Sequence, residues 1–463
     1  MSTICAISTA PGTGGIAVIR ISGAEAIPLT ERVFRPRNPK KQLSLCEANS
    51  LTYGQAFDLQ GELIDEVVAA LFRSPHSFTG EDTVELSCHG SLFIQQQLLQ
   101  ALIDAGCRLA EPGEFTRRAF MNGKMDLSQA EAVADLIAST SAGQHRLALN
   151  QMRGGFSHEL GELRNQLLHI TSLMELELDF SDHEELEFAD RGELSELAQR
   201  IETKISSLVR SFSLGNAIKN GTPVAIIGET NAGKSTLLNA LLGEEKAIVS
   251  DIHGTTRDVI EDTINLSGQL FRFIDTAGIR QTTDTIESIG ISRSFKALEK
   301  AQIVILMDDL SRPAADFQQF VSEIQPHLKQ QTVVVAHNKC DLTADIRQIE
   351  LPAEWKEVQL SAKEQVGIDD LRQILIQAVQ SPNLQASDTI VSNARHYEAL
   401  THALEAIQRV REGLSCQLSG DFIAQDIREC IFHLSDIAGQ VTTDDVLQNI
   451  FSHFCIGKKM ALF

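Results

Sequence analysis

One segment limits the possible folds of this 463-residue chain more than any other: VAIIGETNAGKST, residues 224–236. An apolar run typical of a buried strand leads into G-x-x-x-x-G-K-S spacing, and the apolar TLLNALL follows as a predicted helix. Backbone N–H groups at such a helix N-terminus bind phosphate, because the helix dipole favours negative charge there. Lys234 is expected to reach the β- and γ-phosphates, and the Ser235 hydroxyl to bind Mg²⁺. The predicted phosphate site comprises Asn231, Ala232, Gly233, Lys234, Ser235 and Thr236.

Three further motifs follow in the order typical of a GTPase. Asp275-Thr276-Ala277-Gly278 closes the predicted strand LFRFID, with its carboxylate near the metal and the Gly278 N–H near a γ-phosphate. After the strand TVVVAH comes Asn338-Lys339-Cys340-Asp341, whose last carboxylate can accept both N1–H and the 2-amino group of guanine. Adenine would leave that carboxylate unpaired, which is costly in a buried site. Ser361-Ala362-Lys363 is expected to close over the base, so the motifs together predict a guanine nucleotide.

The catalytic and cation-binding residues of this site are not given by a complete motif and are inferred from their positions. Ile279 stands where Ras-like GTPases carry the glutamine that orients water, so nearby Glu287 is the best candidate for that role. A solvated carboxylate at a helix start is the alternative for Glu287. Thr256 is the expected switch threonine for Mg²⁺, and Asn231 can offer a carbonyl oxygen to a monovalent cation that replaces an arginine finger. Thr256 belongs to the segment SDIHGTTRD, residues 250–258. This segment adds to the predicted nucleotide site Ser250, Asp251, Ile252, His253, Gly254, Thr255 and Thr256.

The hydrophobic pattern predicts a multidomain architecture. Residues 1–120 mix short strands with turns, as an α+β domain does, and residues 121–217 show helical spacing, with Ser128 and Glu131 as a possible capping box. Residues 218–381 alternate strands with helices, which is typical of a parallel sheet covered by helices. Helical spacing returns over residues 382–463. We therefore expect an α/β P-loop domain inserted into a discontinuous all-α domain.

Charge and composition exclude several function classes. Forty Lys+Arg against 62 Asp+Glu give a net charge of −22, which argues against a general nucleic-acid or anionic-membrane surface. The basic segment 31–41, ERVFRPRNPKK, is predicted to be an exposed loop, with a local basic patch as the alternative. The 8 cysteines include no C-x-x-C pair, so neither a zinc site nor a disulfide scaffold is indicated. Without a secretory signal or an apolar run of about 18 residues, the chain is expected to be cytosolic and not membrane-bound.

The motifs together resemble the MnmE family, also called TrmE, of GTPases that modify the wobble uridine of tRNA. The resemblance extends over essentially the whole chain, because GGIAVIRISG, FTGEDTVEL, PGEFTRRAFMNGKMDLSQAEAVADLI and the C-terminal FCIGK accompany the GTPase motifs. It implies an N-terminal folate-binding and dimerisation domain, a discontinuous helical domain and an inserted G domain. It also implies a heterotetramer with an FAD-dependent MnmG-type partner, the FAD being on that partner. The pair would install an aminomethyl or carboxymethylaminomethyl group at carbon 5 of uridine 34, using a tetrahydrofolate one-carbon unit.

The resemblance also implies roles for individual residues. In the family, potassium stimulates hydrolysis by driving the G domains together. The positions that bind potassium correspond here to Asn231, Ser250, Ile252 and Thr255. The magnesium positions are Ser235 and Thr256, and the water-orienting glutamate is Glu287. The folate-contacting positions are Arg20, Glu85, Lys124 and Lys458.

The C-terminal motif implies a further role and carries a departure from the family pattern. Cys455 falls where the family cysteine is proposed to act in the modification chemistry, and packing beside Phe454 is its alternative. The family chain usually ends at the lysine matched by Lys458, whereas here Lys459-Met460-Ala461-Leu462-Phe463 follow.

Two other functions remain open on the residues alone. A regulatory GTPase switch without modification chemistry fits the nucleotide motifs equally well, but has no need for Arg20, Glu85 and Lys124 around a folate. A folate-dependent enzyme with a vestigial nucleotide domain is disfavoured by the intact phosphate and guanine motifs. Because the net charge is −22, tRNA binding is expected to rely on the partner's surface and on local patches such as residues 31–41.

Overall fold

The computed structural model describes residues 2–179, 191–243, 262–274, 298–329, 331–343, 349–379, 389–441, 447, 450 and 451. It divides into two compact units, which are taken separately below. Unit 1 comprises Met1–Ala134, Met152–Leu160 and Ser435–Phe463, and unit 2 comprises Asp135–Gln151 and Gly161–Leu434. Within the described ranges, no helix is both long and apolar enough to cross a membrane.

Unit 1 is built on a 7-stranded sheet with the order β3-β4-β5-β6-β2-β1-β7. Neighbouring strands pair antiparallel, except that β7 runs parallel to β1 at the end of the sheet. The strands are β1 (Ile4–Ile7), β2 (Gly14–Ser22), β3 (Phe34–Pro36), β4 (Ser50–Phe57), β5 (Leu63–Phe72), β6 (Thr83–Gly90) and β7 (Arg108–Leu109).

Helices α1 (Ala26–Val33) and α2 (Leu92–Asp104) cover one face of this sheet. Successive side chains of a strand point to opposite faces, so in β2 the buried Ile19 and Ile21 join the core with the helices. Arg20 between them therefore points to the other face. That second face carries the polar groups described below.

Leu447, Ile450 and Phe451, the described residues near the end of unit 1, pack against helix α3 (Glu114–Met121) and the start of α4 (Leu127–Ala138). The predicted capping box of α4, Ser128–Glu131, is wrong, because the observed one lies two residues earlier. Asp126 Oδ1 accepts from the Gln129 N–H at 2.9 Å, and Gln129 Oε1 accepts from the Asp126 N–H at 3.0 Å. The reciprocal cap is therefore Asp126–Gln129, because the helix begins at Leu127 and leaves Ser128 inside its first turn.

Segment 31–41 is not the single exposed loop that its charges predict. Phe34 is buried and starts β3, which pairs with β4, so the segment contains the end of α1 and an edge strand before the chain turns. Its five basic side chains are nevertheless exposed: Arg32, Arg35, Arg37, Lys40 and Lys41.

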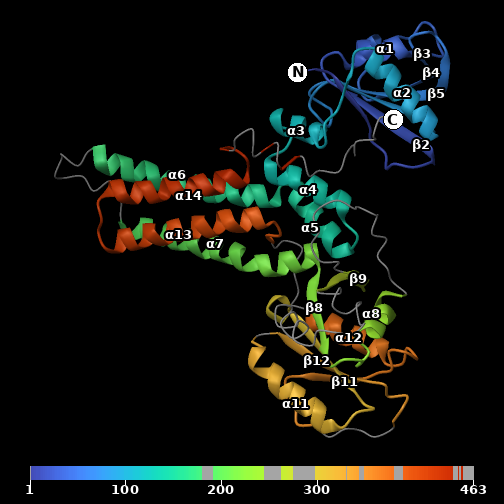
Figure 1. The fold of residues 1–463 in the computed structure, drawn as a ribbon. Helices are drawn as coiled ribbons and strands as arrows, with labels where there is room; N and C mark the ends of the chain where they lie inside the picture. Colours follow the sequence, from blue (N-terminus) through green and yellow to red (C-terminus); the bar gives the residue numbers. More distant parts are fainter. Residues whose placement is uncertain are drawn as a thin grey trace. The chain divides into compact units, whose positions relative to one another are not determined.

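Unit 2 joins helices from both sides of the inserted α/β region. In Figure 1 the green α7 lies along the orange α13, and these helices come from before and after that region. The described helices that lie mainly in unit 2 and outside the α/β region are α5 (Ala142–Met152), α6 (Gly155–Asp179), α7 (Arg191–Asn220), α13 (Ala394–Ser415) and α14 (Gly420–Ile437).

Both ends of the α/β region return to helix α7. The first strand begins two residues after α7 ends, and the returning chain hydrogen-bonds to α7 through the Val391 N–H and Ser211 Oγ, 3.0 Å apart. Gly215 permits this approach, because a Cβ there would lie 2.1 Å from the Val391 carbonyl oxygen. An insertion whose ends lie this close leaves the α7–α13 pair intact.

The α/β region holds a 6-stranded sheet with the order β13-β12-β11-β8-β10-β9. All neighbours pair parallel except the antiparallel β9–β10 ribbon at one edge. The strands are β8 (Thr222–Gly228), β9 (Asp262–Leu266), β10 (Gln269–Phe273), β11 (Ile303–Asp309), β12 (Thr332–Asn338) and β13 (Lys356–Gln359).

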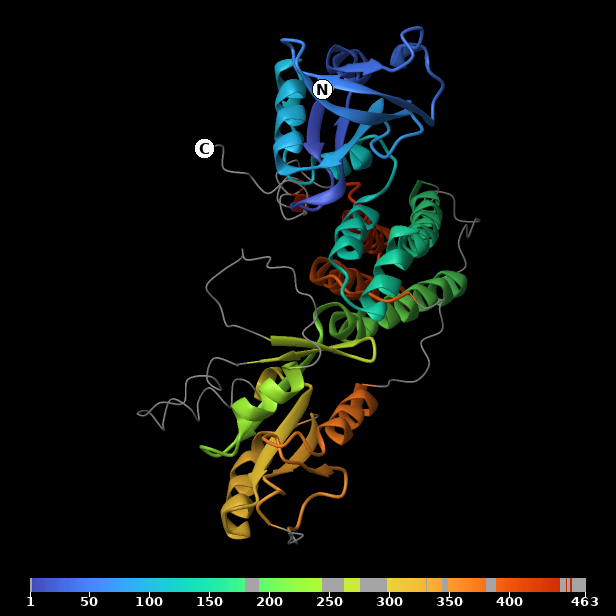
Figure 2. The same cartoon turned by 90° about the vertical axis from the view of Figure 1, so that its right-hand side faces the viewer.

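Helices lie on both faces of this parallel sheet (Figures 1 and 2). Helix α8 (Lys234–Leu242) and α12 (Ile368–Val379) share one apolar core with the sheet, and α11 (Ala314–Ile324) packs in a core on the other face. Every residue of the central strand β11 is buried, as expected for a strand covered on both sides. The carboxyl ends of β8, β11, β12 and β13 therefore meet along one edge, where α/β sheets bind ligands.

Candidate nucleotide-binding site

The phosphate loop lies between β8 and α8 at this edge of the sheet. Gly228 packs against β11, where a Cβ would lie 2.7 Å from the Met307 Cβ. Gly233 has φ +97°, and a Cβ on it would lie 2.2 Å from Asn338 Nδ2. Asn231 also has positive φ, at +65°, a conformation that asparagine tolerates better than most residues. The glycines are therefore required by backbone geometry and by close packing, as well as by the motif.

Lys234 begins α8 and turns back into the loop. Its Nζ donates to the carbonyl oxygens of Gly228 and Glu229, each at 2.7 Å. Burial lowers the pKa of the Lys234 ammonium, and the nearby Arg312 charge lowers it further, while Glu229 opposes the shift. The lysine is thus held within the loop, where it is positioned for an anionic ligand. The described Asn231–Thr236 segment forms one continuous loop and first helical turn, as predicted.

Asn338 connects the three described recognition loops. Its Nδ2 donates to the Ala232 carbonyl at 2.8 Å, and its Oδ1 accepts from the Ala362 N–H at 2.9 Å. The side chain is buried, so both ends of the amide are satisfied within the protein. One amide therefore holds the phosphate loop against the loop after β13. The sequence motifs predict that these loops belong to one site, but not that Asn338 bonds to both.

The other described motif residues surround Asn338 at the sheet edge. Lys339, with φ +67°, donates from Nζ to Asp309 Oδ2 at 2.5 Å. Asp341 and Lys363 are exposed, whereas Ser361 is buried in a bridge with Val366. The structure thus brings together the predicted groups at positions 231–236, 338–341 and 361–363.

Several predicted residues lie outside the described part of the chain. These are Ser250, Asp251, Ile252, His253, Gly254, Thr255, Thr256, Asp275, Thr276, Ala277, Gly278, Glu287, Cys455 and Lys458.

Two charged residues beside the phosphate loop were not predicted from the sequence. Arg312, after β11, pairs with Glu229 of the loop, with Nη1 and Oε2 2.5 Å apart. Asp309, at the end of β11, accepts from Lys339 and from Ser311. Burial would raise the Asp309 pKa, but these hydrogen bonds outweigh it and lower the pKa. Arg312 and Glu229 are 83 residues apart, so no local pattern indicates their pairing.

A second polar centre lies on the face of the unit 1 sheet opposite to α1 and α2, where Phe115 of α3 packs. Arg20 of β2 pairs with Glu85 of β6 at 2.8 Å, and these residues are direct cross-strand neighbours. The Arg20 guanidinium lies 5.0 Å from the Phe78 ring centroid and 5.6 Å from that of Phe115. Both charged side chains remain about a quarter exposed, so the pair is accessible while its geometry is fixed by aromatic rings.

Lys124 approaches the same region from the chain after α3. Its Nζ donates to the Pro75 carbonyl at 2.9 Å, and its Cγ lies 3.3 Å from the position of a Cβ on Gly80. Pro75 and Gly80 flank Phe78 in the segment that packs over Arg20. Three predicted folate-contacting residues, Arg20, Glu85 and Lys124, therefore converge on one segment of unit 1.

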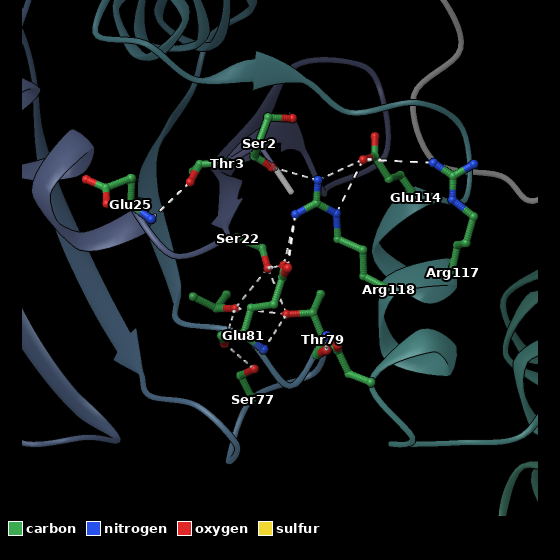
Figure 3. A network of polar contacts seen from close by, with 12 residues as sticks. Ser2, Thr3, Ser22, Glu25, Ser77, Thr79, Glu81, Glu114, Arg117 and Arg118 are labelled. Carbon is green, nitrogen blue, oxygen red and sulfur yellow. Dashed lines mark hydrogen bonds and ion pairs between the residues drawn. The ribbon is translucent and has the colours of Figure 1, made fainter.

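Next to this segment lies a buried charge cluster (Figure 3). The Arg118 guanidinium lies between two carboxylates, 3.0 Å from Glu81 Oε2 and 2.9 Å from Glu114 Oε1, and donates to the Ser2 carbonyl at 2.7 Å. Glu114 and Arg118 are 2% and 3% exposed. Burial opposes ionisation of Glu114, but hydrogen bonds from Arg108, the Glu111 N–H and Arg118 lower its pKa. The sequence motifs did not indicate this cluster, because Glu81 and Arg118 are 37 residues apart.

Comparisons with known proteins assign the chain to a family. The model described as "GTP-binding protein TrmE N-terminus" matches residues 3–124, and the "MnmE helical domain" model matches residues 127–455. The "tRNA modification GTPase MnmE" of Parabacteroides distasonis is 69% identical, covering 99% of this chain and 100% of that protein. The protein of the same name from Bacteroides thetaiotaomicron is 59% identical, covering 98% and 99%. The solved FeoB G domain of Methanococcus jannaschii is 26% identical, with a TM-score of 0.24, covering 35% of this chain and 98% of that domain. The chain belongs to the MnmE (TrmE) family of tRNA modification GTPases.

Proposed function

We propose that this protein hydrolyses GTP to drive modification of the wobble uridine of certain tRNAs. The observation that carries the nucleotide part is the bonding of Asn338, which joins the phosphate loop to the Ser361–Lys363 loop. This geometry supports a site in which Asp341 accepts both donors of a guanine, while Asn231–Thr236 hold the phosphates. The tRNA part rests on family membership and on relatives matched over their full length.

The phosphate loop fits a magnesium-bound nucleotide. A Cβ at Gly233 would occupy the narrow space against Asn338, and Lys234 is already held inside the loop. We assign Mg²⁺ to Ser235 and Thr256, and K⁺ to Asn231, Ser250, Ile252 and Thr255. These cations would neutralise charge on the phosphates, and Glu287 would orient the attacking water. Ser250–Thr256 and Asp275–Gly278 complete the proposed nucleotide contacts.

For unit 1 we propose binding of a tetrahydrofolate one-carbon derivative. The cross-strand Arg20–Glu85 pair supports this assignment, because it offers a donor and an acceptor side by side between two aromatic rings. Lys124 adds a cation that suits the carboxylate-rich folate tail. Lys458 is assigned to the same ligand, and Cys455 to the modification chemistry as a nucleophile or acid.

The proposed assembly follows the family. The chain would dimerise through its N-terminal domain (1–120), and would act in the cytoplasm with an MnmG-type partner that carries FAD. The remaining proposed domains are a helical domain (121–217 and 382–463) and a G domain (218–381). The product is carboxymethylaminomethyl- or aminomethyl-uridine at position 34. The exposed basic residues of segment 31–41 are a proposed local contact for tRNA.

GTP turnover by the full chain in potassium and in sodium at matched ionic strength tests the GTPase mechanism. We expect strong stimulation by potassium, and loss of turnover in Asn231→Ala and Glu287→Ala. Equal turnover in the two cations would contradict the potassium assignment but leave GTP hydrolysis standing.

A tetrahydrofolate titration separates a modification enzyme from a pure switch. We expect binding that weakens in Arg20→Met, whereas Arg117→Met, an arginine on α3 paired with Glu111, is the control and should bind normally. Failure of the unaltered chain to bind tetrahydrofolate would favour a GTPase switch without modification chemistry.

A further inference from the structure

Arg312 holds the phosphate loop from the side of β11. Its Nη1 pairs with Glu229 Oε2 at 2.5 Å, and its Nη2 donates to the Thr230 carbonyl at 3.1 Å. Both contacts are to residues between Gly228 and Gly233, so one guanidinium binds a side chain and a carbonyl of the loop. We propose that Arg312 is a positioning residue of the nucleotide site, whose role is to neutralise Glu229 beside the phosphates. This inference rests on the proposed nucleotide function of that loop.

The need for such a residue follows from the charge of Glu229. A carboxylate in a phosphate-binding loop repels a polyphosphate, and the repulsion grows with the charge of the ligand. The Glu229 carboxylate is only partly exposed, so water screens it incompletely. Glu229 and Arg312 also shift the Lys234 pKa in opposite directions, so both charges act on the ammonium group that is proposed to bind the phosphates.

The turn after β11 explains why Arg312 points to the loop. Asp309 Oδ1 accepts from the Ser311 N–H at 3.0 Å and from Ser311 Oγ at 2.6 Å, and the Arg312 N–H donates to the Asp309 carbonyl at 3.0 Å. Asp309 Oδ2 then lies 3.9 Å from Arg312 Nε and 2.5 Å from Lys339 Nζ. A buried carboxylate thus links Arg312, at the phosphate loop, to Lys339, in the guanine motif.

The test is a binding titration of the full chain with fluorescently labelled GDP and GMP. We expect Arg312→Ala to weaken GDP binding about tenfold and GMP binding less, because repulsion by the unpaired Glu229 increases with phosphate charge. Arg312→Lys should retain most of the affinity. The double variant Glu229→Gln/Arg312→Ala should recover GDP affinity to within about twofold, since both charges are then absent.

The control is Arg409→Ala, which removes an arginine that also bridges two partners, Asp426 and Glu429, but lies outside the α/β region. It should bind both nucleotides like the unaltered chain. The inference is overturned if the double variant stays as weak as Arg312→Ala, or if GDP and GMP lose affinity equally. Failure of the unaltered chain to bind GDP would instead contradict the proposed nucleotide function.

Discussion

The two units hold their charged groups in different ways. In unit 1, Arg118 lies between Glu81 and Glu114 in a buried cluster whose members satisfy one another. At the nucleotide site, Lys234 and Arg312 lie at a sheet edge and bond largely to the backbone of one loop. A closed cluster contributes chiefly to stability, because removing one member leaves buried charges unpaired. Charges at an open edge remain available to a ligand, so changes there should affect binding first.

Arg118→Met should have the largest effect, and that effect should fall on stability. The substitution leaves the buried Glu114 and the largely buried Glu81 without their shared partner, and we expect a loss of about 3–5 kcal/mol in the stability of unit 1. Hydrogen exchange of the β2 amides in the full chain measures this loss. Nucleotide affinity should be unchanged.

The neighbouring arginine is the matched control. Arg117 lies on the same helix, is 30% exposed and pairs with the exposed Glu111 at 3.1 Å. It reaches Glu114 only at 4.0 Å, and its removal leaves Glu114 paired with Arg108 and Arg118, so Arg117→Met should cost less than about 1 kcal/mol. If both variants lower protection of β2 equally, the distinction between a closed cluster and an exposed pair is wrong.

Gly233→Ala tests the open edge. The added Cβ would meet Asn338 Nδ2 at 2.2 Å, and alanine would be strained at φ +97°. We expect GDP affinity to fall about 100-fold, since displacement of Asn338 separates the phosphate loop from Ala362 and the strain adds about 1–3 kcal/mol. A fluorescence titration measures the affinity.

Gly161→Ala in α6 is the control, because nothing lies within 4 Å of its added Cβ. It should leave GDP affinity unchanged. If Gly233→Ala binds GDP like the unaltered chain, Asn338 does not hold the loop in the way the structure indicates.

The difference between the two regions also explains what the sequence could predict. The phosphate loop is contiguous, and its strand–loop–helix context fixes both glycines and Lys234, so the pattern predicted the loop correctly. A local rule also accounts for Arg20, which leaves the core because it alternates in β2 with the buried Ile19 and Ile21. By contrast, Arg118–Glu81 and Arg312–Glu229 join residues 37 and 83 positions apart, and only the folded sheets bring them together.

The exact residue at which a helix starts is a second feature that the sequence did not predict. Ser128–Glu131 and Asp126–Gln129 both have the spacing of a capping box, and the sequence does not say which residue precedes the first turn. A contact with the segment after α14 distinguishes them, because the Leu127 N–H at the helix start bonds to the Ala438 carbonyl at 3.2 Å. Tertiary contact therefore selected between two equivalent local patterns.

His337 combines the two cases, because it lies in the α/β region between the buried carboxylate of Asp308 and the exposed carboxylate of Glu357. Its replacement should have the smallest effect. Its ring nitrogens lie 2.8 Å from Asp308 on β11 and 3.1 Å from Glu357 on β13, while Phe317 of α11 packs edge-on against the ring. Burial would lower the His337 pKa, but the bonds to both carboxylates outweigh it and raise the pKa above 6.5.

A group with a raised folded-state pKa stabilises the fold fully below its unfolded pKa of about 6.5, and this contribution is lost as the pH rises through the folded pKa. Unit 2 of the unaltered chain should therefore lose stability to urea on passing from pH 6 to pH 9 more steeply than His337→Gln. His145→Gln, which removes an exposed histidine, should keep the steeper loss. Identical pH profiles for the unaltered chain and His337→Gln would show that the imidazole is neutral in the fold, and that this cluster is held by hydrogen bonds alone.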